Sequence, residues 1–182
     1  MIKLYGKNKI INYFTAALRN GALSHLYIFE GAVGVGKKTL AQNLAALINC
    51  KSTASPCGTC PDCVKLRSGN HPDVIWVREE DPTKKSISVE TVRDMLSDVY
   101  IKPFLSDRKI YIVPDAETLT PQAQNALLKV LEEPPSYITI FLLTTAQNAL
   151  LKTVLSRGLL LKLDTLSLDE MHSYICDSFP DK

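Results

Sequence analysis

The feature that most constrains the fold is a short apolar strand that runs directly into a glycine-rich loop and then a helix. LYIFE (26–30) precedes GAVGVGKKT (31–39), and apolar residues continue after the loop at helical spacing. This order is the context of a phosphate-binding loop, whose backbone N–H groups face an anion at the helix N-terminus. The pattern G-x-x-x-x-G-K-[ST] fits from Gly31 to Lys37, but Lys38 stands where a hydroxyl residue belongs. The sequence therefore predicts a phosphate-loop fold with one altered functional position.

Apolar strands alternate with helices along the rest of the chain. Because the strands are continuously apolar, they indicate a parallel sheet that is covered by helices on both faces. Further strands are predicted at 73–77, 109–113, 138–143 and 159–163, and helices at 8–19, 39–49, 89–100, 121–133 and, as a short element, 148–155. The expected architecture is α/β.

Four of the five cysteines fall in one short segment with the spacing C-x6-C-x2-C-x2-C. Four thiolates match a tetrahedral zinc site, and a site filled by protein ligands leaves no place for a reactive water. The sequence therefore predicts a structural zinc ion. Reduced structural cysteines or a disulfide remain the alternative. The predicted ligands are Cys50, Cys57, Cys60 and Cys63.

Length and composition bound the domain organisation. The chain has 182 residues, 46% of them hydrophobic and 22% charged, which is typical of a globular protein. No apolar run approaches the ~20 residues that span a bilayer, so we expect a cytoplasmic protein. We expect one domain over residues 1–165, with the zinc module at 50–63 inserted into it, and the start of a truncated helical lid domain at 166–182.

Several further motifs resemble a known family, and they occur in the family's order. GNHPDVIWV (69–77) follows the cysteine segment, and QNALLKVLEEPP (124–135) and LSRG (155–158) come after it. Together they resemble the clamp-loader subunits of bacterial DNA polymerase III. This resemblance implies a RecA-like AAA+ domain with an inserted four-cysteine zinc module, acting in DNA replication. It also implies as partners the other loader subunits (gamma/tau and delta) and, through the assembled complex, the sliding clamp and primed DNA, with no membrane contact.

The family has an ATP-hydrolysing branch, called gamma or tau, and a non-hydrolysing branch, called delta prime. Hydrolysis requires a hydroxyl and a carboxylate that hold Mg²⁺, and a second, catalytic carboxylate that orients the attacking water. Lys38 cannot coordinate a cation, and Thr39 is displaced along the helix by about 100° and 1.5 Å. Aligned from the NALLK motif, Pro114 replaces the metal-holding Asp and Asp115 replaces the catalytic Glu. A one-residue shift makes Asp115 the metal ligand instead, and then Ala116 replaces the base.

Either alignment favours the delta prime branch without intrinsic ATPase activity, and the alternative is a gamma/tau-type motor with a variant loop. We expect the loop to serve as a structural scaffold whose glycines are kept for packing, and ATP binding without hydrolysis is the less favoured alternative. A DNA-binding zinc protein that only shares the fold is less favoured, because the cysteine segment lacks a run of basic and aromatic residues. The predicted cofactor-binding positions are Gly31, Gly34, Gly36, Lys37, Lys38 and Thr39 in this degenerate Walker A loop and Asp115 in the acidic motif.

The resemblance assigns a different catalytic role to the LSRG segment. In the family, a Ser-Arg-Cys motif sends its arginine across an interface to the ATP of the neighbouring subunit. Here Ser156 and Arg157 match that motif, and Gly158 replaces the cysteine. We therefore expect Arg157, supported by Ser156, to act in trans as an arginine finger. The alternative is an ordinary surface arginine between a helix and a strand.

Overall fold

A five-stranded parallel sheet forms the centre of the protein. The computed structural model describes residues 5–52, 55–79, 81 and 83–178, so the predicted zinc module and both predicted domains include a few residues outside this part. The strand order is β2-β3-β4-β1-β5, and every pair of neighbouring strands is parallel. The strands are β1 (Leu26–Glu30), β2 (Val74–Trp76), β3 (Lys109–Val113), β4 (Ile138–Thr144) and β5 (Leu159–Lys162). The prediction of a parallel α/β sheet is confirmed.

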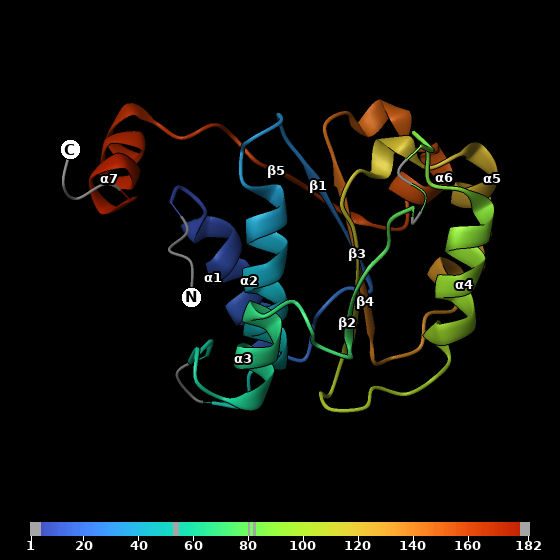
Figure 1. Ribbon diagram of the computed structural model, residues 1–182, viewed down its shortest axis with the longest axis horizontal. Coiled ribbons are helices and arrows are strands. Elements are labelled where there is room, and N and C mark those ends of the chain that lie inside the picture. The colour runs from blue at the N-terminus through green and yellow to red at the C-terminus, as the bar shows by residue number, and fades with distance from the viewer. Residues whose placement is uncertain (1–4, 53–54, 80, 82, 179–182) are drawn as a thin grey trace.

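Helices cover both faces of this sheet, as predicted (Figure 1). One face carries α1 (Asn8–Arg19), α2 (Lys37–Asn49) and α3 (Pro61–Arg67), and the other carries α4 (Val89–Val99), α5 (Pro121–Glu132) and α6 (Lys152–Leu155). Each layer has its own core, because strand side chains alternate between the two faces: Phe29 and Phe141 pack under α2, whereas Ile28 and Leu142 pack under α5. A last helix, α7 (Leu168–Ser178), lies to one side of both layers. No helix among the described residues is long and apolar enough to cross a bilayer.

The structure divides the short helix predicted at 148–155. This segment forms a 3-10 turn at Gln147–Ala149 and, separately, the helix α6. The Gln124 side chain, 3% exposed, causes the break, because its amide donates to the Ala149 carbonyl (3.1 Å) and accepts from the Leu151 N–H (2.7 Å). These backbone groups are therefore satisfied by a side chain instead of by a continuous helix.

A buried polar network joins the cysteine segment to the sheet. Asp73, 1% exposed, accepts the backbone N–H groups of residues 104, 105 and 106 at 2.6–2.8 Å. The Asp73 N–H donates to Nδ1 of His71, so Nε2 of this imidazole carries the proton and donates to Asp62 in α3 (3.1 Å). Ser106 also donates to Asp62 (2.8 Å). The network therefore fixes α3, which carries two of the cysteines at its start, against the edge of the sheet.

Candidate functional site

Three strand ends form the candidate site at the carboxyl edge of the sheet. Because the strand order is β3-β4-β1, the glycine loop after β1 lies next to the end of β4 and one strand away from the end of β3. The Gly31 N–H donates to the Thr144 carbonyl (3.1 Å), and Asp115 follows β3. Ligands of open α/β sheets bind at this edge. Segments far apart in the sequence thus meet where the motifs predict an anion site.

The glycines of the loop occupy positions at which a larger residue would be strained or would clash. Gly34 and Gly36 have φ angles of +82° and +89°, and a side chain at Gly31 would place Cβ 2.9 Å from the Leu163 carbonyl. Gly36 precedes the first residue of α2, so the helix begins two residues earlier than predicted. The Lys37 Nζ donates to the carbonyls of Gly31 (2.5 Å) and residue 32 (2.9 Å), and burial lowers the pKa of this lysine. The Lys37 ammonium therefore binds backbone carbonyls at the start of the loop.

Lys38 makes an ion pair with the acidic motif. Its Nζ lies 3.3 Å from Oδ2 of Asp115, and both side chains are more than half exposed. An ammonium offers no lone pair to a metal, and the Pro114 side chain offers none either. Lys38 and Pro114 therefore supply no ligand for a magnesium ion, and the Asp115 carboxylate is paired with a cation. Thr39 lines a pocket on the α7 side of the loop, together with residues 33–36 of the loop itself.

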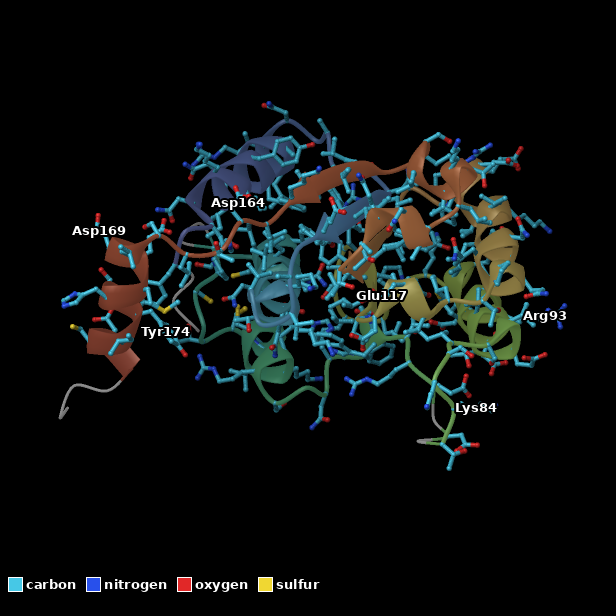
Figure 2. The ribbon with its side chains drawn as sticks, turned by 90° about the horizontal axis from the view of Figure 1, so that it is seen from above. Lys84, Arg93, Glu117, Asp164, Asp169 and Tyr174 are labelled. Carbon is cyan, nitrogen blue, oxygen red and sulfur yellow. The ribbon has the colours of Figure 1, made fainter. Side chains whose placement is uncertain are left out.

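That pocket extends the loop toward the C-terminal helix. It has a volume of about 470 Å³ and lies between the loop, the N-terminal segment and α7. Lys7 donates to the Asp164 carbonyl (2.6 Å), and Tyr5 stacks edge-on against Tyr174 with ring centroids 5.5 Å apart. Figure 2 shows Tyr174 and Asp169 on α7 at one side of the molecule and Glu117 near its middle. The pocket is lined by Tyr5, Lys7, Val33–Gly36, Thr39, Thr165, Leu166, Met171 and Tyr174.

Sequence reasoning missed Glu117, which is a second carboxylate at this edge. Its Oε1 accepts the N–H and the hydroxyl of Thr145 at 3.3 and 2.7 Å, and its Oε2 is buried without a hydrogen-bond partner among the described atoms. Burial acts to raise the pKa of Glu117, but the hydrogen bonds from Thr145 outweigh it, and the pKa is lowered. The only signal in the sequence was the D-x-E spacing of residues 115–117. The site thus keeps an ionised carboxylate, bound to the end of β4.

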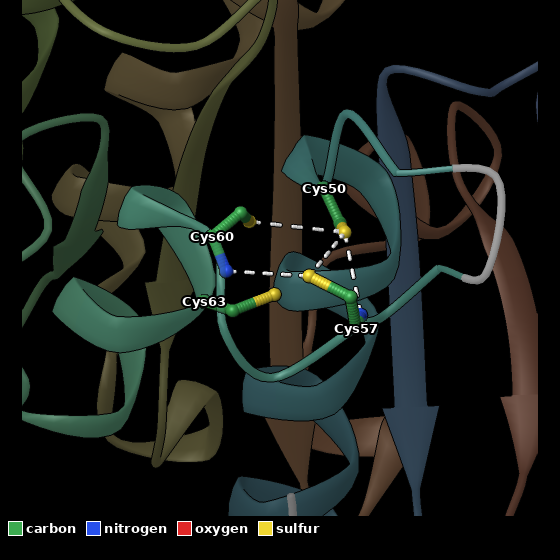
Figure 3. Close-up of side chains that lie close together, drawn as sticks. All are labelled: Cys50, Cys57, Cys60 and Cys63. Carbon is green, nitrogen blue, oxygen red and sulfur yellow. Dashed lines mark hydrogen bonds between the residues drawn. The ribbon is translucent and has the colours of Figure 1, made fainter.

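The four cysteines converge into one cluster, as predicted (Figure 3). Their Sγ atoms all lie within 4.8 Å of one another, with 3.6 Å between Cys50 and Cys57 and 3.9 Å between Cys50 and Cys60. A tetrahedral site with Zn–S bonds of about 2.3 Å has S–S edges of about 3.8 Å. The cluster therefore fits zinc. Pro61 at the first turn of α3 and Gly58 with φ of +76° form the tight turn between the ligands.

The environments of the individual thiols differ. Hydrogen bonds from the Thr59 backbone and hydroxyl lower the pKa of Cys57 to about 5, whereas burial raises the pKa of Cys63 to about 12. A bound zinc ion would override this difference, because a coordinating thiol is deprotonated outright. Without a metal, Cys57 is thus the more acidic of these two thiols.

Arg157 lies on the layer of α5 and α6, and its side chain contacts both of these helices. It follows Ser156 directly after α6, and its guanidinium contacts Glu132 and the Thr153 carbonyl. Gly158 fits the next position because a Cβ there would lie 2.7 Å from Leu26, which is fully buried in β1. The glycine that departs from the family motif therefore brings the chain close to the sheet. The catalytic roles of Arg157 and Ser156 stay predictions.

Comparison with known proteins identifies relatives over nearly the whole chain. A family model described as "DNA polymerase III, delta subunit" matches residues 6–167, and the chain belongs to this family. DNA polymerase III subunit tau/gamma of Haemophilus influenzae is 36% identical over 93% of this chain and 24% of its own length. Subunit tau of Escherichia coli is 35% identical over 91% of this chain and 26% of its own length. Subunit gamma of Buchnera aphidicola subsp. Acyrthosiphon pisum is 33% identical over 94% and 47%. The chain thus spans a quarter to a half of these relatives, and their names favour the gamma/tau branch over the delta prime branch that the sequence analysis preferred.

Solved structures agree on the fold. A gamma subunit-related protein of Thermotoga maritima superposes with a TM-score of 0.67 and 25% identity over 90% of this chain and 49% of its own. A point variant of Thermotoga maritima RuvB gives 0.57 with 20% identity over 93% and 48%, and domain III of the DnaA protein of that organism gives 0.56 with 15% identity over 100% and 73%. The last two show the fold alone. They share the RecA-like AAA+ fold that the sequence predicted.

Proposed function

We propose that this chain acts in DNA replication, because it belongs to the family described as "DNA polymerase III, delta subunit". Its specific role is that of a clamp-loader subunit of DNA polymerase III. We expect it to associate with other subunits of the loader and, through the complex, with the sliding clamp and primed DNA. Nothing in this role requires the chain to read bases, so its contacts with DNA should be to phosphates and sensitive to salt.

Within the loader, we propose that the chain supports ATP hydrolysis by a neighbour and does not hydrolyse ATP itself. The observation that carries this proposal is the ion pair between Lys38 and Asp115. P-loop hydrolysis depends almost entirely on a metal ion and on positioned charges. The Lys38–Asp115 ion pair lies where the family motif expects the metal ligands. Pro114 stands at the position of the other ligand and has no carboxylate. This is the role of the delta prime stator.

The second candidate is a gamma/tau-type motor with a variant loop. The names of the relatives favour it. Glu117 also favours it, because this carboxylate lies close enough to the loop for its charge to act on Lys37, and its buried Oε2 has no hydrogen-bond partner among the described atoms. Hydrolysis requires such a group to orient the attacking water. The two candidates share the same complex and differ only in whether this subunit turns over ATP.

ATP turnover by the purified chain separates the two candidates. We expect no turnover above background, and we expect Lys38→Thr not to restore it, because Pro114 still supplies no carboxylate for a metal. Release of phosphate would be followed with and without Mg²⁺. The matched control is Lys37→Ala, which removes the ammonium that would contact the phosphates of a bound nucleotide, so any rate that survives it comes from a contaminant. Magnesium-dependent turnover that Lys37→Ala abolishes would establish the motor role instead.

A further inference from the structure

We propose that Glu132 is a positioning residue that holds the Arg157 guanidinium in the orientation from which it reaches a neighbour's ATP. This inference rests on the proposed function, in which Arg157 acts in trans. The sequence alone does not distinguish Glu132 from Glu133, because the two glutamates are adjacent at the end of the NALLK segment. The structure distinguishes them, because of these two glutamates it is Glu132 that forms an ion pair with Arg157.

The contacts of Arg157 come from two different helices. Nη2 donates to Oε1 of Glu132, the last residue of α5, at 2.8 Å. Nη1 donates to the carbonyl of Thr153 in α6 at 2.9 Å and lies 3.5 Å from the Ser156 hydroxyl. These bonds hold one edge of the guanidinium plane. No residue that the structure describes accepts from the Nε–H, so this donor remains available to a phosphate, an anion that the planar guanidinium suits.

The backbone beneath this side chain is already fixed. The N–H of Arg157 donates to the Val154 carbonyl (3.1 Å), and Gly158 packs against Leu26. The long side chain of Arg157 can still rotate. This rotation is restricted only when another group holds the guanidinium. Glu132 is the charged group among the described residues that holds it.

The location of Glu132 argues for an orienting role and against a stabilising one. A carboxylate at the last residue of α5 faces the negative end of the helix dipole, which is unfavourable unless a cation is near. Its side chain is 55% exposed and that of Arg157 is 32% exposed, and ion pairs this exposed contribute little to stability. The pair therefore restricts the guanidinium without holding the fold together.

The test is Glu132→Ala in the reconstituted loader, with Glu133→Ala as the matched control. Glu133 is the adjacent, exposed residue, and its side chain has no partner among the described residues. We expect Glu132→Ala to lower kcat of the DNA-stimulated ATPase about tenfold with little change in KM for ATP, because the loosened arginine stabilises the transition state less well. Glu132→Gln keeps an acceptor for Nη2 and should recover part of the rate.

Two further measurements separate positioning from a structural role. In an Arg157→Ala background, Glu132→Ala should cause no additional loss, and the single variant should unfold at the temperature of the parent chain. An equal loss in Glu133→Ala, a loss that persists without Arg157, or an unchanged kcat in Glu132→Ala would overturn the inference. If Arg157→Ala itself leaves the ATPase unchanged, the proposed function fails instead.

Discussion

Replacing Arg157 by alanine should slow ATP hydrolysis by the assembled clamp loader by ~10³ or more, without affecting the fold of the chain. A guanidinium supplied across an interface stabilises the charge that develops on the transferred phosphoryl group, and its loss typically costs this much. Arg157 is one-third exposed and follows α6 on a backbone that Gly158 fixes against β1. The side chain is therefore accessible to a neighbour from a rigid base.

The measurement is the steady-state ATPase rate of the reconstituted complex with primed DNA and sliding clamp. Arg157→Lys should recover little of the rate, because an ammonium keeps the charge but lacks the planar fork. Arg19→Ala is the control for loss of a positive charge, since Arg19 ends α1 on the opposite face of the sheet. A complex that contains Arg157→Ala and hydrolyses ATP at the parental rate would show that this arginine is an ordinary surface residue.

Replacing Cys60 by serine should release the zinc and unfold the segment around residues 50–63. Structural zinc sites contribute about 10–16 kcal/mol to the folding of small peptides, and the neutral Cys63 thiol gains its ionisation from the metal. The sheet is stabilised by two hydrophobic cores of its own. We therefore expect the cysteine segment to unfold first while the rest of the chain stays folded. The network through Asp62 and Ser106 would then lose its α3 side.

Elemental analysis and limited proteolysis measure this effect. The parent chain should carry about one zinc ion, and the variant should carry none and be cleaved within the module. Cys176→Ser is the matched control, because Cys176 is exposed on α7, away from the cluster, and should leave the zinc content unchanged. A parent chain purified without zinc, or a Cys60→Ser chain with full zinc content, would contradict the site.

The layout of the sheet was predictable because its signals are local. Continuous apolar strands such as 138–143 and helix starts such as Thr120-Pro121 determine elements within a few residues, and the elements then alternate as a parallel sheet requires. The four cysteines were predictable for the same reason, since a short spacing forces their Sγ atoms together. The break between Gln147–Ala149 and α6 was not predictable, because the side chain that causes it lies more than twenty residues away at Gln124.

The sequence by itself determined the altered chemistry of the phosphate loop, since the ammonium of Lys38 cannot coordinate a metal in any fold. Only the tertiary structure decided which carboxylate pairs with that lysine, because Asp115 and the loop meet only when β3, β4 and β1 lie side by side. It also decided that Glu117 binds Thr145, and that Glu132 rather than Glu133 holds Arg157. The physical reason is the same in each case. Side-chain chemistry belongs to the residue, whereas a contact belongs to the packing of segments that are distant in the chain.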